Sequence, residues 1–193
     1  MLLRRLAPVL LVASTALLLS SGHTVRQVEP EVPSDICFVA PPTPYDPRSG
    51  VALLAPRAIP LNARCPVCGG FVSRAPDWAA QLVFRNGDTQ FFDSPLSLFI
   101  YLRNVNRYTP GRRTSDVAAS YVRAMGDGRW TPSQEAVYVT GSSLPGPMRG
   151  GNLPAFLDVS DAQRFMSNHG GEIVHPANIT AALLQSLNAR HAH

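Results

Sequence analysis

Residues 80–99 read AQLVFRNGDTQFFDSPLSLF, and this stretch sets the pattern for the rest of the chain. Two apolar runs, 80–84 and 89–92, contain the valine, threonine and phenylalanine residues that favour strands. Asn86 and Gly87 lie between them, and this pair favours the positive φ angles of a tight hairpin turn. The stretch therefore begins with a predicted antiparallel hairpin.

A helix is predicted directly after this hairpin. Ser94 is a favoured N-cap residue, and Pro95 then takes the first helical position, where its missing N–H breaks no hydrogen bond. Leu98, Phe99 and Leu102 recur at helical spacing. This spacing gives the predicted helix one apolar face that can be buried against the hairpin.

The same order of elements is predicted a second time. A strand at 118–123 closes the first round. The second round consists of strands at 136–139 and 152–157, a helix over 160–169 and a returning strand at 172–174. Ser160 is the expected N-cap of that helix, and Gly170 its expected end. The predicted fold class is therefore α+β, with two small related strand–strand–helix–strand halves packed as one globular unit.

The prolines divide the chain. Eight of the 18 prolines fall in residues 23–60, which we therefore interpret as an extended linker. The globular unit is expected over 61–187, with its halves at about 61–123 and 130–180. Residues 188–193 would form a short tail.

The first 22 residues have the composition of an export signal. Arg4 and Arg5 form a basic start, residues 6–19 are apolar, and small residues follow. His23 comes next, where a lipoprotein signal would carry a cysteine. We expect an exported, periplasmic protein, with an uncleaved N-terminal anchor as the alternative that would associate it with the membrane.

Composition argues against several classes of function. The formal net charge is +4, without a basic run or interleaved aromatic residues, so nucleic acid is not an expected partner. The chain shows no paired general acid and base, nucleophile elbow or phosphate loop, so an enzyme is not expected. Three cysteines exclude a complete disulfide framework.

Two of these cysteines, Cys65 and Cys68, are separated by two residues in a turn-rich segment. This spacing is compatible with structural zinc, a redox dithiol, a structural pair or a soft metal ion. A long Pro/Gly loop at 142–151 presents Met148. Two thiolates with a thioether suit Cu(I), and His169 is a possible additional nitrogen ligand.

At this point the motifs resemble those of the NosL family, copper-binding accessory proteins for nitrous oxide reductase. The similarity covers about residues 61–176. The matching motifs keep their order and are CPVCGGFV at 65–72, DWAAQLVF at 77–84, FFD at 91–93, YVTGS at 138–142, GPM at 146–148, LPAF at 153–156 and HGG at 169–171.

The resemblance implies a Cu(I) metallochaperone of denitrification rather than an enzyme. Such a protein would pass copper to the copper–sulfide centre of nitrous oxide reductase, assisted by a membrane ABC-type complex. Cys68 and Met148 match the family's motif residues, whereas Gly70 stands where the family carries a methionine, so Cys65 is expected to supply a second thiolate. The rival hypotheses are a periplasmic thiol–disulfide oxidoreductase using Cys65 and Cys68, and a metal-free assembly scaffold.

Overall fold

The computed structural model describes residues 40–147 and 151–189, and these belong to one compact unit. The predicted export signal, the first part of the predicted linker and Met148 lie outside the described residues. Within the described part of the chain, no helix is both long and apolar enough to cross a membrane.

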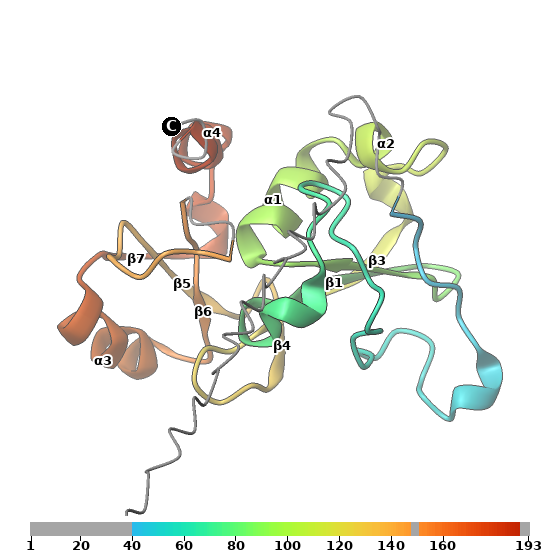
Figure 1. Cartoon of the computed structure of the whole chain (residues 1–193), viewed down its shortest axis with the longest axis horizontal. Helices are drawn as coiled ribbons and strands as arrows, with labels where there is room; N and C mark the ends of the chain where they lie inside the picture. The colour runs from blue at the N-terminus through green and yellow to red at the C-terminus, as the bar shows by residue number, and fades with distance from the viewer. Residues whose placement is uncertain (1–39, 148–150, 190–193) are drawn as a thin grey trace, which may run out of the picture. The chain divides into compact units, whose positions relative to one another are not determined.

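The first half is built around the predicted hairpin (Figure 1). β1 (Ala80–Phe84) pairs with β2 (Thr89–Phe92), and α1 (Pro95–Arg103) follows at once. β3 (Val117–Arg123) returns along the other side of β1, and β4 (Trp130–Pro132) extends the sheet. The resulting antiparallel order is β2-β1-β3-β4.

The second half repeats this topology. β5 (Val137–Thr140) lies between β6 (Ala155–Phe156) and β7 (Glu172–Val174), with α3 (Val159–His169) between β6 and β7 in the chain. In each half the first strand is central, and the second and the returning strand pair with it antiparallel. The predicted α+β class and the repeated strand–strand–helix–strand order are therefore confirmed.

The core joins the two halves. Leu98, Phe99 and Tyr101 of α1 are buried, and the Phe99 ring meets Tyr138 of β5 edge-on at 5.3 Å between centroids. The two sheets also touch where the Met125 N–H donates to the Ala155 carbonyl at 2.8 Å. One larger apolar cluster consequently contains residues of both halves.

Three short elements were not predicted from the sequence. They are α2 (Val105–Tyr108), β4 and α4 (Ala181–Ala189). α4 packs against α1 and buries Leu184 and Leu187 in the core. The packed unit therefore continues beyond the expected end at residue 187.

The N-cap predicted for α3 was wrong. Asp158, not Ser160, caps this helix, because its Oδ1 accepts the Asp161 backbone N–H at 2.9 Å and the Ser160 hydroxyl at 2.8 Å. The carboxylate is also favoured by the positive end of the helix dipole. The strand expected at 152–157 is limited to Ala155–Phe156.

Residues 40–60 lie on the first sheet, although composition assigned them to a linker. Thr43 exchanges two backbone hydrogen bonds with Thr89 of the edge strand β2, at 2.7 and 2.8 Å. The Arg57 backbone exchanges two more with the side-chain amide of buried Gln81, at 2.8 and 3.1 Å. This segment covers a sheet edge that would otherwise present unpaired backbone groups.

Candidate metal site

The cysteines lie in a closed turn, not at the start of a helix. The Cys65 N–H donates to the Gly70 carbonyl at 2.9 Å, and the Gly69 N–H donates back to the Cys65 carbonyl at 2.8 Å. Gly69 has φ 76°, a left-handed conformation that glycine adopts without strain. The Arg64 guanidinium also donates to the Gly69 carbonyl at 2.9 Å. These bonds hold the loop on which Cys68 is carried.

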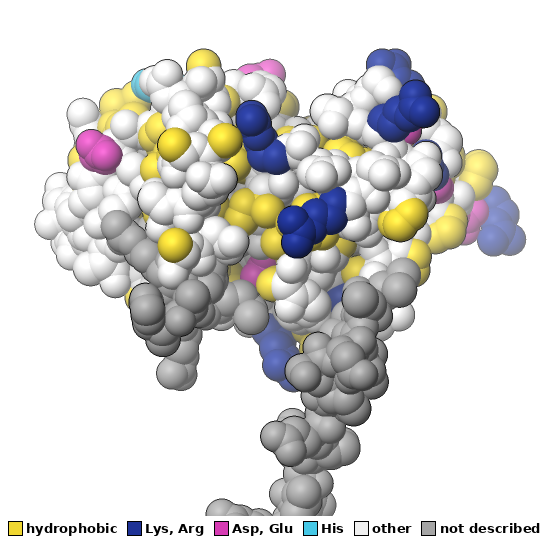
Figure 2. All heavy atoms as spheres, turned by 90° about the horizontal axis from the view of Figure 1, so that it is seen from above, with side chains coloured by type: hydrophobic (Ala, Val, Ile, Leu, Met, Phe, Trp, Pro, Cys, Tyr) yellow, Lys and Arg dark blue, Asp and Glu magenta, His cyan; other side chains and the backbone are white. Residues whose placement is uncertain are grey.

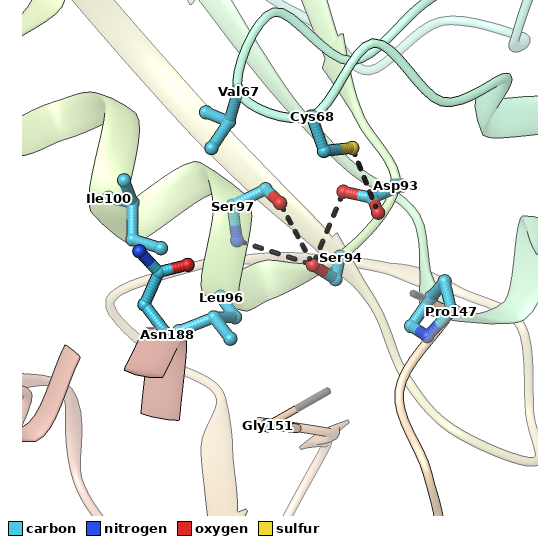
Figure 3. Close-up of a pocket in the computed structure, with 10 residues that line it drawn as sticks. All are labelled: Val67, Cys68, Asp93, Ser94, Leu96, Ser97, Ile100, Pro147, Gly151 and Asn188. Carbon is cyan, nitrogen blue, oxygen red and sulfur yellow. Dashed lines mark hydrogen bonds between the residues drawn. The ribbon is translucent and has the colours of Figure 1, made fainter. Parts of the chain in front are cut away.

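Three potential ligand atoms converge at this turn. The sulfur atoms of Cys65 and Cys68 and a carboxylate oxygen of Asp93 all lie within 4.8 Å of one another. Cys65 is fully buried, Cys68 is exposed, and neither forms a disulfide. The Cys68 thiol donates to Asp93 Oδ2 at 3.3 Å, and Figure 3 shows the sulfur pointing toward that carboxylate.

Asp93 owes its position to the junction of β2 and α1. It follows the last residue of β2 and precedes the N-cap Ser94, and only 3% of its surface is exposed. The Ser94 hydroxyl donates to Asp93 Oδ1 at 3.4 Å. The hairpin and the helix cap therefore aim a buried carboxylate at the cysteine turn. Sequence reasoning did not connect Asp93 with the cysteines, although the residue belongs to the FFD motif at 91–93.

The surroundings of Cys68 favour the protonated thiol. The hydrogen bond between the Cys68 and Cys65 side chains raises the pKa of Cys68, and partial burial, the electrostatic influence of Cys65 and the negative charge of Asp93 raise it further. Nucleophilic redox cysteines show the opposite shift, because a helix N-terminus or a cation stabilises their thiolate. The metal-free turn is therefore unlike a redox dithiol.

A cavity of about 300 Å³ opens beside Cys68 (Figure 3). Cys68 and Asp93 line it from the first half, Pro147 and Gly151 from the long loop of the second half, and Asn188 from α4. Pro147 and Gly151 are the described residues on either side of 148–150. The described residues that flank positions 148–150 therefore both line the cysteine cavity.

Glycine is required where this loop passes α4. A Cβ added to Gly151 would lie 2.8 Å from the Leu187 carbonyl carbon and closer still to its oxygen. Such contacts are closer than van der Waals packing allows. The absence of a side chain at Gly151 lets the loop approach both α4 and the cavity.

The structure does not bring His169 to the cysteines. His169 ends α3 and lines a different cavity, together with Met125 and Phe165. Its ring lies against Phe165, with 4.6 Å between the ring centroids. Among the cysteine, histidine and carboxylate side chains of the described residues, those of Cys65, Cys68 and Asp93 lie close enough together to hold a metal ion.

Comparison with known proteins identifies the family to which this chain belongs. The NosL family model matches residues 56–184. The chain belongs to the NosL family. A curated relative, the copper-binding lipoprotein NosL of Stutzerimonas stutzeri, is 31% identical over 133 residues, which are 68% of this chain and 70% of the relative. The crystal structure of the copper chaperone NosL from Shewanella denitrificans matches with a TM-score of 0.57 and 25% identity, covering 66% of this chain and 97% of that one.

The NosL match includes the cysteine turn, Asp93 and both halves of the fold, so the resemblance predicted from the motifs is confirmed. It begins at residue 56, slightly before the expected boundary at 61. The names of these two relatives, a copper-binding lipoprotein and a copper chaperone, agree with the expectation that this chain is not an enzyme.

Proposed function

We propose that this chain is a copper chaperone that binds one Cu(I) between Cys65 and Cys68 and passes it on outside the cytoplasm. The observation that carries the proposal is the meeting of two free thiols, of which the exposed one, Cys68, lines a cavity. The copper-related names of the relatives point to the same metal.

The donor atoms fit a soft metal ion that accepts few ligands. Thiolates select Cu(I), and Cu(I) is stable with two or three of them or with thioethers. Structural zinc is tetrahedral and requires four ligands. Among the described residues, three candidate ligand groups meet at this turn, and the carboxylate is the harder of the donors.

The two cysteines have different roles in the proposed transfer. Cys65 is buried and retains the metal, while Cys68 is exposed and can be reached by a ligand of the partner protein. A new copper–ligand bond to the partner forms as the bond to Cys68 breaks, and copper is neither oxidised nor reduced. When copper arrives, Cys68 must lose its proton, and Asp93 already accepts a hydrogen bond from that thiol.

Met148 remains a predicted third ligand. The residues on either side of its segment, Pro147 and Gly151, line the same cavity as Cys68. A thioether from Met148 would add a third soft ligand to the two thiolates. His169 is not included in the proposed site because it lines another cavity.

The proposed receiver is nitrous oxide reductase, whose copper–sulfide centre would be assembled with the help of a membrane ABC-type complex. This part of the proposal rests on the family membership. A relative named as a lipoprotein agrees with an exported, membrane-associated chain, and the proposed location is the periplasm.

The metal site is tested by titrating the reduced full-length chain with Cu(I) against a competing chelator. We expect one tight site that weakens by about tenfold or more, which is about 1.4 kcal/mol, in Cys65→Ser and in Cys68→Ser. Cys37→Ser is the matched control, since it removes a thiol outside the turn. No competition with the chelator, or the same result in all three variants, would exclude the proposed site.

Delivery is tested separately by producing nitrous oxide reductase together with the wild-type chain or the Cys65→Ser/Cys68→Ser variant. With the variant, we expect the reductase to contain less copper and to reduce nitrous oxide more slowly. Equal copper content in both would exclude delivery, even if the chain binds Cu(I). Reduction of insulin by the copper-free chain would instead favour the oxidoreductase hypothesis.

A further inference from the structure

We propose that the groove between α1 and α4 binds an acidic, partly apolar segment of the protein that exchanges copper with Cys68. The α1–α4 groove consists of the cysteine cavity and a second cavity of about 250 Å³. This inference rests on the copper-transfer function proposed above and adds the surface on which the partner is held.

The two cavities are adjacent. Both are lined by Ile100 of α1 and Asn188 of α4, which lie at the boundary between them. Cys68 lies in the first cavity, and Arg103 and Arg107 lie in the second. A chain segment in the α1–α4 groove would therefore run from the cysteine to the arginines.

The floor of the α1–α4 groove is apolar. Ile100 and Tyr108 are half-buried, and Leu184 of α4, which lines the same cavity, is almost fully buried. Val67 and Leu96 continue this apolar lining into the cysteine cavity. An aliphatic side chain of a partner would gain free energy by leaving water here.

The second cavity carries positive charge without a counter-charge. Arg103 and Arg107 are exposed, and within the described part of the chain neither makes an ion pair with a carboxylate. No acidic residue lines this cavity. Figure 2 shows arginine side chains beside a hollow in which hydrophobic atoms are visible, on the face that carries α1, α2 and α4. The complementary partner group is a carboxylate.

The spacing along α1 limits the sequence of the partner. Ser97 lines the first cavity, and Arg103 lines the second, six residues later in the same helix. At about 1.5 Å per helical residue this is about 9 Å. An extended chain covers that length in about three residues. We therefore expect an acidic residue about three positions from the residue that lies beside Ser97 in the cysteine cavity.

The test uses a peptide of this design, acetyl-Met-Ala-Leu-Glu-Glu-amide, and a control peptide with glutamine in place of both glutamates. Each is titrated into the ¹⁵N-labelled full-length chain and followed by NMR. We expect the acidic peptide to shift signals of Ile100, Arg103, Arg107 and Leu184. The double variant Arg103→Gln/Arg107→Gln should weaken binding by about fivefold, the size expected for two exposed ion pairs. Added salt should also weaken binding.

Arg48→Gln/Arg129→Gln is the matched control, because it also removes two arginine charges, at side chains with 90% and 71% exposure outside the groove. Equal binding of the two peptides, unchanged binding by the double variant, or shifts located elsewhere would overturn the proposal. A further titration uses vesicles containing phosphatidylglycerol in place of the peptide. If they shift the same signals and the peptide does not, the groove binds lipid headgroups and the proposal for a protein partner is wrong.

The copper titration separates this inference from the proposed function. Arg103→Gln/Arg107→Gln should keep the wild-type Cu(I) affinity, because neither arginine lies in the cysteine cavity. If the wild-type chain fails to bind Cu(I) but binds the acidic peptide in the groove, the copper function is wrong and the docking surface stands. If it binds Cu(I) but not the peptide, the copper function stands and the docking surface is wrong.

Discussion

The Cys68 thiol donates a hydrogen bond to Asp93, with 3.3 Å between Sγ and Oδ2, across 25 residues of sequence. This contact joins the cysteine turn to the junction of β2 and α1. It places a negative charge beside the exposed member of the cysteine pair, which disfavours the thiolate until a cation compensates for it. The contact therefore ties the reactivity of Cys68 to the fold of the first half.

Replacing Asp93 by asparagine should lower the pKa of Cys68 in the metal-free protein. The carboxylate raises this pKa, together with the hydrogen bond to Cys65 and burial. The asparagine amide is uncharged, so the thiolate should form at lower pH. The pH dependence of Cys68 alkylation by iodoacetamide, followed by mass spectrometry, measures this change. Glu172→Gln controls for the loss of one remote charge, and an unchanged or higher midpoint in Asp93→Asn would contradict the prediction.

Met148→Ala and His169→Ala should affect copper binding differently. Loss of a thioether ligand should weaken Cu(I) binding by about tenfold, or about 1.4 kcal/mol. His169 lines another cavity, so its removal should leave the Cu(I) affinity as it is in the wild type. Cu(I) titrations of the two variants against a competing chelator measure both affinities. A tenfold loss in His169→Ala would restore His169 to the ligand set, and an unchanged Met148→Ala would limit the site to the cysteine turn.

Gly171→Ala should destabilise the second half more than Gly126→Ala does. Both glycines have positive φ, 98° and 86°, so both substitutions introduce backbone strain of about 1 kcal/mol. A Cβ at Gly171 would also lie 2.7 Å from the Thr140 carbonyl oxygen, whereas a Cβ at Gly126 meets nothing within 4 Å. We expect an additional loss of about 2 kcal/mol in the free energy of unfolding.

Urea unfolding of the two glycine variants measures this difference. The comparison isolates the close approach between Gly171 and β5 from the strain common to both sites. Equal losses in the two variants would show that the backbone at β5 moves aside at little cost.

The protein should lose stability above about pH 10 because Tyr138 is buried. Burial raises the pKa of Tyr138, so at high pH the unfolded chain loses this proton while the folded chain retains it. The free energy of unfolding therefore does not depend on Tyr138 below about pH 10 and falls above it. The chain contains no lysine, so lysine deprotonation does not obscure this effect.

Tyr138→Phe is the variant that tests this assignment. It should lose about 1 kcal/mol at neutral pH, because the Tyr138 hydroxyl donates to the buried Ser133 carbonyl at 2.7 Å. Above pH 10 its free energy of unfolding should fall less steeply than that of the wild type. Urea unfolding at a series of pH values measures the free energy of unfolding of both proteins. If the two free energies fall equally steeply above pH 10, groups other than Tyr138 cause the loss of stability.

A fragment that starts at residue 61 should be less stable than one that starts at residue 40. It lacks the two Thr43–Thr89 backbone hydrogen bonds and the two bonds between Arg57 and the Gln81 side chain. At about 0.5–1.5 kcal/mol for each bond, we expect a loss of at least about 2 kcal/mol. Urea unfolding of both fragments measures it. Equal stability would show that residues 40–60 behave as the linker that their proline content indicated.

The features that the sequence predicted correctly depend on neighbouring residues. Asn86-Gly87 closes the hairpin, with Gly87 at φ 87°, and Ser94 caps α1 through the Ser97 N–H, because both effects act over a few bonds. The Cys65-x-x-Cys68 spacing brings two thiols together for the same reason. The repeated order of such local signals predicted the α+β class and both halves.

Other features were decided by packing between distant segments. Asp93 and His169 are both polar residues at helix ends, and no local pattern distinguishes the one that meets Cys68 from the one that lies against Phe165. α4 consists mostly of good helix formers but is too short to be stable alone, and it is stabilised by burying Leu184 and Leu187. Sequence by itself therefore determined the cysteine turn and the order of elements, through interactions between near neighbours. Tertiary structure alone decided which carboxylate, loop and helix surround the turn, because those contacts form only when distant segments pack together.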